Sequence, residues 1–284
     1  MNETLLAVEG LGKVFASRAS LFGRGKRGVQ AVDAVSFTVA RGETLALVGE
    51  SGCGKSTTGR LILRLMEPSA GRVLFQGRDI ARAGRREMHA VRRRLQIIFQ
   101  DPFGSLSPRR TVAETIAEPL DAHGLVHSAV GRRDQVAALM ARVGLPADTM
   151  HRYPREFSGG QRQRIGIARA IGVGPALVVA DEPVSALDVS VQAQIVNLLQ
   201  DLQAEQALSY LFISHDLRIV RHIAHRVAVM YLGRIVEVGP KPQVFGAPQH
   251  PYSQALLSAA PEPGRGSVKN LGQVACLSGS DRPG

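Results

Sequence analysis

The segment ETLALVGESGCGKST, residues 43–57, constrains the fold more than any other part of this 284-residue chain. It fits the pattern G-x-x-x-x-G-K-[ST] from Gly49 to Ser56, between an apolar strand and a helical pattern. Glycines let the backbone curl round a phosphate group so that several N–H groups point inward, and the following helix adds its positive N-terminal end. A chance glycine-rich loop would not explain this strand–loop–helix context. The segment therefore predicts an α/β fold built around a phosphate-binding loop.

Two side chains at the end of this loop have specific predicted roles. Lys55 would reach the β- and γ-phosphates of a nucleotide, and the hydroxyl of Ser56 would bind Mg²⁺. Cys53 stands at a variable position and is interpreted as a tolerated filler rather than a redox sensor. The predicted ATP-binding residues of the loop are Gly49, Glu50, Ser51, Gly52, Cys53, Gly54, Lys55, Ser56 and Thr57.

A pair of carboxylates follows the apolar run LVVA, residues 177–180. Asp181 ends the predicted strand, where it can hold Mg²⁺ through water, and Glu182 follows it immediately. Neighbouring side chains of a strand point to opposite sides, but a turn at the strand end can aim both carboxylates at one site. Glu182 would then polarise an attacking water. Alone, the pair could equally cap a helix, and with the loop it still leaves a P-loop small-molecule kinase open.

Strands and helices alternate along the chain, which predicts a mainly parallel sheet with helices on both faces. The predicted strands are 5–15, 31–40, 43–50, 71–77, 176–181, 208–214, 226–232 and 234–239. The predicted helices run from after Lys55 to Met66, through the 80s to Arg94, over 111–144 with a break near Gly124, and onward from Val189 and from Leu217. A Gly/Arg-rich connection is predicted at 17–28.

The segment FSGGQRQR, residues 157–164, has the composition of a second phosphate-binding loop. With LVVADEPVSALD about twenty residues later, it resembles the signature and following segments of ATP-binding cassette (ABC) ATPases, and the resemblance covers about residues 4–260. In that family two nucleotide-binding domains pack head to tail, and each ATP lies between the phosphate loop of one and the signature of the other. The resemblance therefore implies that Ser158, Gly159, Gly160 and Gln161 contact ATP held by a partner. It also implies a P-loop NTPase core with an antiparallel β subdomain and an inserted α-helical subdomain.

The resemblance carries further roles over to matching positions. Gln100, in IIFQDP, resembles the glutamine that contacts Mg²⁺ and the attacking water, and His215, in FISHD, resembles the switch histidine that hydrogen-bonds the γ-phosphate. Phe15 resembles the aromatic residue that stacks on adenine, although an aromatic there could simply be core. The loop expected to cross the dimer interface is Ser185, Ala186, Leu187 and Asp188. The expected Mg²⁺ ligands are Ser56, Gln100 and Asp181, and the expected catalytic residues are Glu182, His215, Gln100 and Lys55.

Three segments indicate which kind of cassette this is. YPREFSGGQ resembles importer subunits, whereas QDPFGSLSPRRTV and HPYSQALLSAAP resemble the subfamily that powers oligopeptide and dipeptide uptake. Related subunits often continue into a cysteine-rich segment, some with an iron–sulfur cluster, but the tail here has only Cys276, and no cluster is carried over. Nickel, opine and glutathione importers use closely similar subunits and remain alternatives.

The resemblance also implies partners and a location. The expected partners are a second ABC ATPase subunit, identical or different, two integral membrane permease subunits and an extracytoplasmic substrate-binding protein. The chain would lie peripherally on the cytoplasmic face of the inner membrane. We expect one nucleotide-binding domain at 1–260, with the helical subdomain at about 101–160, and a poorly ordered Gly/Ser/Pro-rich tail at 261–284.

Composition bounds the remaining alternatives. The net charge of +11 favours anionic partners and would suit a soluble cassette ATPase acting on DNA or ribosomes. Such proteins usually carry two cassettes or a long coiled-coil insertion, which this sequence lacks, so no nucleic-acid partner is expected. Only two cysteines indicate a reducing compartment. The N-terminus has no signal-peptide pattern, and no stretch approaches the roughly 20 apolar residues that span a bilayer.

Overall fold

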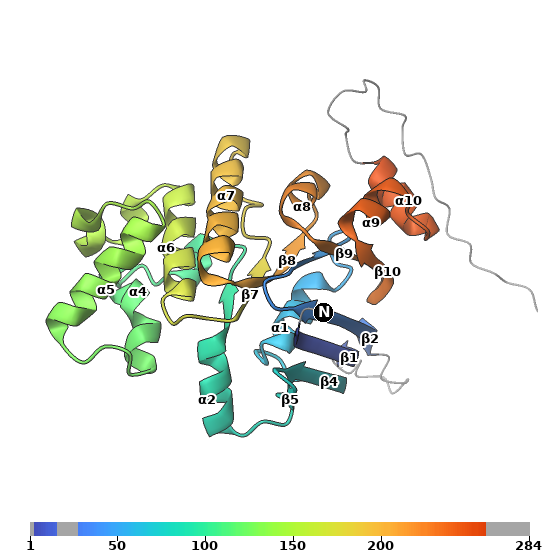
Figure 1. Ribbon diagram of the computed structural model, residues 1–284, viewed down its shortest axis with the longest axis horizontal. Coiled ribbons are helices and arrows are strands. Elements are labelled where there is room, and N and C mark those ends of the chain that lie inside the picture. Colours follow the sequence, from blue (N-terminus) through green and yellow to red (C-terminus); the bar gives the residue numbers. More distant parts are fainter. Residues whose placement is uncertain (1–2, 16–27, 260–284) are drawn as a thin grey trace, which may run out of the picture.

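The computed structural model describes residues 3–15 and 28–259. Two β-sheets and the helices that pack against them make up this part of the chain (Figure 1). The predicted tail at 261–284, with Cys276, lies outside the described residues, as does the predicted connection at 17–28 except for its last residue.

The core sheet has six strands in the order β10-β9-β3-β8-β7-β6. Five of them run parallel, and β10 pairs with β9 in the antiparallel direction. Every residue of β3, β7 and β8 is buried. Their continuous apolar runs follow from this, because both faces of a parallel sheet are covered. The bounds are Thr44–Val48 (β3), Leu95–Ile98 (β6), Leu177–Asp181 (β7), Ser209–Ser214 (β8), Arg226–Tyr231 (β9) and Arg234–Pro240 (β10).

The side chains of β7 alternate between two apolar cores. Leu177 and Val179 belong to the core shared with the antiparallel sheet, whereas Val178 and Ala180 belong to the core shared with the helices α4 to α7. Successive side chains of a strand point to opposite faces, so one short strand supplies both cores. The same alternation holds along β8.

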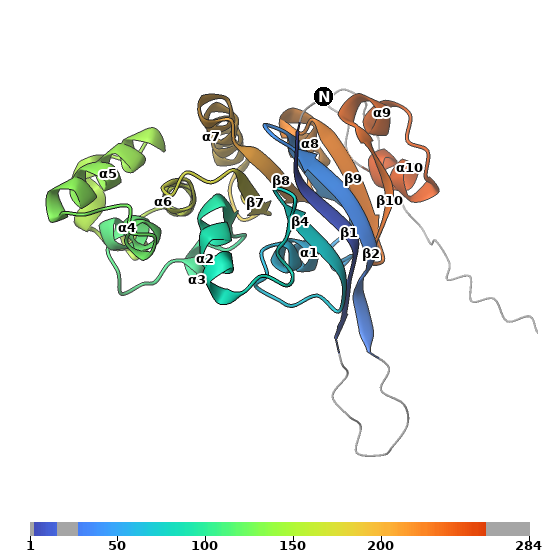
Figure 2. The same ribbon diagram turned by 60° about the horizontal axis from the view of Figure 1, so that its bottom comes forward.

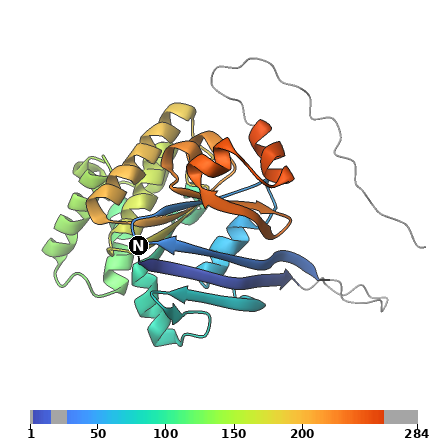
Figure 3. The same ribbon diagram turned by 45° about the vertical axis from the view of Figure 1, so that its right-hand side comes forward.

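A second, antiparallel sheet has the strand order β2-β1-β4-β5 and forms a separate layer (Figure 3). In β2 the buried side chains of Val35, Phe37 and Val39 alternate with exposed ones, as expected for a sheet with one covered face. The bounds are Thr4–Phe15 (β1), Val29–Ala40 (β2), Ala70–Phe75 (β4) and Arg78–Asp79 (β5).

Helix α1, Lys55–Ile62, joins the two sheets. It contacts β2 of the antiparallel sheet and β7 and β8 of the core sheet. Its buried residues Leu61 and Ile62 lie in the same apolar core as Leu6 of β1 and Leu45 of β3. The helix that follows the phosphate-binding loop is therefore held from both sides.

The chain between β6 and β7 is helical, and these helices lie at one end of the molecule, away from β1, β2 and β10 (Figures 1 and 2). Helix α4 packs on α5 and α6. Thr111 caps α4 through a capping box with Glu114, which explains the helix start that the sequence predicts. The bounds are Pro102–Ser105 (α3), Val112–Ala122 (α4), Ala129–Arg142 (α5), Ala147–His151 (η1), Pro154–Glu156 (η2) and Gly159–Ile171 (α6).

The remaining helices flank the core sheet. Helix α8 packs on β3 and β8, and α9 on β9 and β10. The bounds are Arg85–Arg94 (α2), Val189–Gln206 (α7), Leu217–Ile223 (α8), Lys241–Gly246 (α9) and Pro251–Ser258 (α10). None of the helices in the described part of the chain is long and apolar enough to cross a membrane.

The predicted α/β fold, with its mainly parallel core, antiparallel sheet and inserted helices, is confirmed. One local boundary was predicted wrongly, and some elements were not predicted. Helix α1 ends at Ile62 rather than Met66, because Arg64 adopts a left-handed backbone with φ 48° and its guanidinium bonds the Ala83 carbonyl. The strand β6 was not predicted, because four residues after a basic helix give too short a pattern. Helices α9 and α10 were also not predicted.

Candidate nucleotide-binding site

The loop between β3 and α1 has a backbone that only glycine adopts easily. Gly49, Gly52 and Gly54 have φ values of 151°, 82° and 110°. A Cβ atom on Gly49 would lie 2.2 Å from the Met230 carbonyl oxygen, and one on Gly54 would lie 2.4 Å from the Ala31 carbonyl oxygen. The loop is thus packed closely against β9 and β2, and its shape requires glycine at these positions.

This packing gives a stability prediction with a matched control. Gly42 also has a positive φ, 70°, but a Cβ atom there would meet nothing within 4 Å. We expect Gly42→Ala to lower the free energy of unfolding by about 1 kcal/mol for its left-handed backbone alone. Gly54→Ala should cost about 2 kcal/mol more, because its methyl group overlaps the Ala31 carbonyl. Urea denaturation without nucleotide measures both, and equal losses would contradict the close packing.

The ammonium group of Lys55 lies inside the loop. Its Nζ donates to the carbonyl oxygens of Gly49 and Glu50, each at 2.8 Å, and the side chain is almost fully buried. The Cys53 thiol lies beside it, with Sγ 3.8 Å from Nζ. Burial raises the pKa of Cys53, and the Lys55 charge only partly offsets this rise. The loop therefore carries one buried positive charge next to a thiol.

Ser56 and Asp181 bring two hard oxygen donors together. The Ser56 hydroxyl donates to Oδ1 of Asp181 at 2.7 Å. Burial raises the pKa of Asp181, and the hydrogen bond from Ser56 opposes the rise. A divalent cation here would stabilise the charged carboxylate, and hydroxyl and carboxylate oxygens are ligands that Mg²⁺ accepts. The donor set fits Mg²⁺.

Glu182 lies at the end of β7 with its backbone in the left-handed region, at φ 47°. Oε2 of Glu182 accepts a hydrogen bond from Nε2 of Gln100 at 2.9 Å and lies 3.3 Å from Nδ1 of His215. The Glu182 side chain is 13% exposed and the His215 ring 56% exposed. The left-handed backbone of Glu182 turns the chain, so that its carboxylate lies at the same edge of the sheet as that of Asp181. Gln100 donates through its nitrogen, so its amide oxygen remains the group available to a cation.

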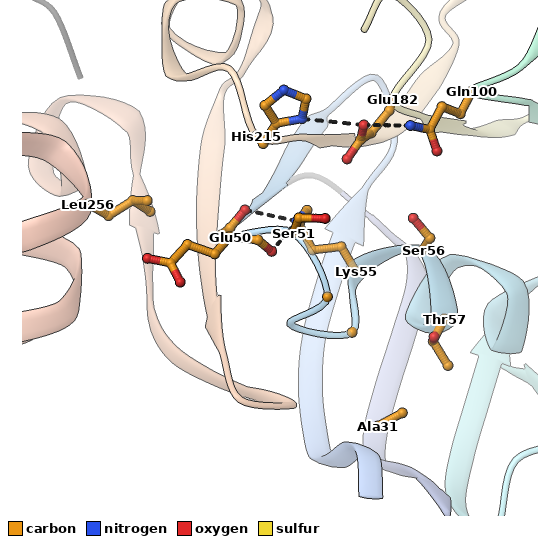
Figure 4. Close-up of a pocket in the computed structure, with 13 residues that line it drawn as sticks. Ala31, Glu50, Ser51, Lys55, Ser56, Thr57, Gln100, Glu182, His215 and Leu256 are labelled. Carbon is orange, nitrogen blue, oxygen red and sulfur yellow. Dashed lines mark hydrogen bonds and ion pairs between the residues drawn. The ribbon is translucent and has the colours of Figure 1, made fainter. Parts of the chain in front are cut away.

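Lys55, Ser56, Gln100, Glu182 and His215 line one cavity of about 620 Å³. The predicted site residues Cys53 and Asp181 are not among its lining residues and instead contact Lys55 and Ser56. Figure 4 shows His215, Glu182 and Gln100 in a row above Lys55 and Ser56. The cavity is lined by Ala31, Gly49, Glu50, Ser51, Gly52, Gly54, Lys55, Ser56, Thr57, Gln100, Glu182, His215 and Leu256. The sequence predicts all of them as site residues except Ala31 and Leu256. Nothing in the local sequence marks Ala31, whereas Leu256 lies in the segment HPYSQALLSAAP, whose resemblance assigned no residue to the site.

The predicted signature residues do not line this cavity. Ser158 and Gln161 form a capping box at the start of α6. A Cβ atom on Gly160 would lie 2.5 Å from Val191 of α7, and one on Gly159 would lie 3.3 Å from Leu187. The helix start therefore packs against Leu187 of the 185–188 loop and against α7.

The 185–188 loop begins at the cavity. The Ser185 N–H and hydroxyl both donate to the backbone carbonyl of Glu182, at 3.2 and 3.1 Å. The side chains of Ser185, Ala186 and Asp188 are exposed. The loop thus lies between the backbone of Glu182, at the cavity, and the glycines that begin α6.

Phe15 also lies outside the set of lining residues. It ends β1 opposite Val29, and its side chain is 40% exposed. Its ring lies 5.5 Å from Nζ of Lys13. It borders residues that the structure does not describe, and its contact with adenine stays a prediction.

Comparisons with known proteins agree with this geometry. The profile of a family described as "ABC transporter" matches residues 32–185, and that of "Oligopeptide/dipeptide transporter, C-terminal region" matches residues 236–275. An oligopeptide transport ATP-binding protein of Bacillus subtilis is 53% identical over 270 residues, 94% of this chain and 82% of that protein. A glutathione import ATP-binding protein of Shigella dysenteriae is 54% identical over 268 residues, 93% of this chain but 42% of that protein. A solved dimeric ATP-binding cassette in a post-hydrolysis state, bound to ADP and Pi, superposes with a TM-score of 0.73 at 26% identity, covering 83% of this chain and 98% of that chain.

Proposed function

The chain belongs to the ATP-binding cassette family of transporter ATPases, and from that premise we propose that it hydrolyses Mg²⁺-bound ATP to drive the import of oligopeptides or dipeptides through a membrane complex. One observation carries the proposal most directly. Lys55, Ser56 and Glu182 line one cavity, and Ser56 is hydrogen-bonded to the buried carboxylate of Asp181.

The phosphate-binding half of the site consists of the loop and its lysine. Lys55 would exchange its bonds with loop carbonyls for bonds to the β- and γ-phosphates, and the N–H groups of the loop would hold the remaining oxygens. Mg²⁺, when bound at Ser56 and Asp181 with Gln100 beside them, would neutralise negative charge on the phosphates. The Lys55 ammonium, the loop N–H groups and a bound Mg²⁺ would each favour the negatively charged phosphates in this partly enclosed cavity.

The hydrolytic half consists of Glu182 with its two neighbours. The Glu182 carboxylate would accept a proton from water as that water attacks. Gln100 and His215 both contact the same oxygen, Oε2, and so hold the carboxylate in one orientation. His215 would also donate to the γ-phosphate. These three residues follow the ends of β6, β7 and β8, which are neighbouring parallel strands and so bring the three side chains together.

The site would be completed by a second cassette. Ser158, Gly159, Gly160 and Gln161 lie at a capped helix start, where N–H groups and the helix dipole favour an anion. They do not line this chain's own cavity, which supports a role toward ATP held by the partner. The 185–188 loop, anchored to Glu182, would cross the interface between the two cassettes. We propose an identical or related cassette as that partner.

The substrate proposal rests on relatives. The relative from Bacillus subtilis is named for oligopeptide transport, and the matched C-terminal family is described by oligopeptides and dipeptides. Glutathione, itself a small peptide, is the second candidate, because a relative of similar identity is named for its import. Two permease subunits and an extracytoplasmic binding protein would complete the complex, with this chain peripheral on the cytoplasmic face of the membrane.

Purification of the tagged chain from its native cells in mild detergent tests this proposal. We expect mass spectrometry to identify two polytopic membrane proteins, a second cassette and an extracytoplasmic binding protein. Calorimetric titration of that binding protein with di- and oligopeptides and with glutathione would then identify the substrate class. Ribosomal proteins or nucleic acid without membrane subunits would overturn the transport proposal but leave the ATPase assignment intact.

A further inference from the structure

Helix α10, near the C-terminal end of the described chain, touches the phosphate-binding loop. The Tyr252 hydroxyl accepts a hydrogen bond from the Glu50 N–H at 3.1 Å, across 202 residues of sequence. Leu256, one turn later, lines the cavity, and Figure 4 shows it facing the Glu50 side of the loop. Neither residue has been assigned a contact with phosphate, Mg²⁺ or water.

The contact clamps a single peptide unit from two sides. The Gly49 carbonyl and the Glu50 N–H belong to the same planar peptide bond, in which oxygen and hydrogen point in opposite directions. Lys55 donates to this carbonyl from inside the loop, and Tyr252 accepts from this N–H outside it. Hydrogen bonds linked through one peptide unit polarise each other. Tyr252 therefore influences the position of the Lys55 ammonium through this peptide unit, without contacting Lys55 directly.

Several contacts fix the position of Tyr252. Its backbone N–H donates to Nδ1 of His250, the N-cap of α10, at 3.1 Å. Glu237 of β10 accepts from the His250 N–H at 3.1 Å. The Tyr252 ring packs against Tyr231 of β9, with ring centroids 4.2 Å apart and ring planes tilted by 32°. The Tyr252 side chain is thus positioned by α10, which carries it, and by Tyr231 of β9, which packs against its ring.

The turn between β9 and β10 braces the same loop at its other end. The Gly233 N–H donates to the Cys53 carbonyl at 3.0 Å. The Glu50 N–H and the Cys53 carbonyl of the loop are thus held by α10 and by the turn after β9. The loop therefore has less conformational freedom to lose when a ligand binds, and preorganisation of this kind increases affinity.

We propose that Tyr252 is a positioning residue of the phosphate-binding loop, which orients the Gly49–Glu50 peptide and through it Lys55 for the phosphates of a nucleotide. The proposal rests on the proposed function, since it assigns this loop to a nucleotide. On this proposal, helix α10 helps to shape the nucleotide site of its own chain. Leu256 extends the same wall as an apolar neighbour of the loop.

Tyr252→Phe tests the proposal because it removes the hydroxyl but keeps the packed ring. We expect the Kd for Mg²⁺–ADP, measured by titration calorimetry, to rise about fivefold, the effect of losing one hydrogen bond of ordinary strength. ADP avoids turnover during the measurement. Hydrogen exchange of the nucleotide-free protein, followed on peptides that contain Glu50, should become faster, because the Glu50 N–H loses its acceptor.

Tyr210→Phe is the matched control. The buried Tyr210 hydroxyl donates to the Leu199 carbonyl at 3.0 Å, far from the loop. This variant should lower the Tm of the nucleotide-free protein but leave the ADP Kd unchanged. Comparable weakening of ADP binding in both variants would indicate general loosening and overturn the proposal, as would an unchanged Kd for Tyr252→Phe even with faster exchange. Failure of the wild-type protein to bind ADP would instead contradict the proposed function itself.

Discussion

Replacing Glu182 with glutamine will lower the steady-state rate of ATP hydrolysis by about 10²–10⁴-fold, the usual contribution of a positioned base. Glutamine has nearly the same shape, and its carbonyl oxygen can still accept from Nε2 of Gln100, so the cavity should keep its geometry. It cannot accept a proton from water. ADP binding should therefore remain close to that of the wild-type protein. Phosphate release under saturating Mg²⁺–ATP measures the rate, and calorimetry measures the binding.

The same variant should retain ATP long enough to trap the closed pair of cassettes. With its cognate cassette, Glu182→Gln should elute as a dimer in size-exclusion chromatography with Mg²⁺–ATP but not with Mg²⁺–ADP. Glu205→Gln makes the identical chemical change on the exposed face of α7 and serves as the control. Hydrolysis at the wild-type rate in the Glu182 variant would remove Glu182 from the role of base.

Replacing Lys55 with alanine should weaken Mg²⁺–ADP binding by about 10²-fold or more. In the nucleotide complex the side chain would provide charge-assisted hydrogen bonds to phosphate, and such bonds contribute about 1.5–3 kcal/mol each. In the nucleotide-free protein its loss leaves the Gly49 and Glu50 carbonyls without their shared donor, so the stability of the variant must be checked. Calorimetric titration with ADP measures the loss, and circular dichroism checks that the variant is folded.

Lys241→Ala is the matched control for that experiment. The ammonium of Lys241 donates to the Arg221 carbonyl at 2.9 Å, so this variant also removes one lysine–carbonyl bond, but on the outside of α8. Its ADP affinity should equal that of the wild-type protein. Unchanged ADP affinity in the Lys55 variant would contradict the assignment of the phosphate-binding loop.

The parts of the site that the sequence predicts are those with a local pattern. Gly49 to Thr57 belong to the strand–loop–helix segment of fifteen residues at 43–57, and Asp181 ends a strand whose apolar run is continuous. Gln100 and His215 needed the family resemblance, because the strand before Gln100 was not predicted and His215 has no local signal beyond following a strand. Their contact with Glu182 depends on which strands are neighbours in the sheet, and spacing alone does not give that order.

Long-range contacts could not be predicted in this way. The Tyr252–Glu50 bond joins residues 202 positions apart, and the segment around Tyr252 resembles a family motif without revealing what it touches. Ala31 reaches the cavity because Gly54 packs on its backbone, and any small residue would show the same pattern in the sequence. The left-handed backbone of Glu182 was likewise invisible, since glutamate does not mark such a turn.

The strand β7 contributes alternate side chains to two different cores and ends in the two carboxylates of the site. The number of residues in β7 is therefore constrained, and substitutions, which leave that number unchanged, would not reveal the constraint. Inserting or deleting one residue within Leu177–Asp181 would exchange the two sets of apolar side chains between the cores, because the side-chain period of a strand is two. The same change would move Asp181 away from Ser56. A library of single-residue insertions and deletions should consequently find β7 intolerant along its whole length, even where conservative apolar substitutions are accepted.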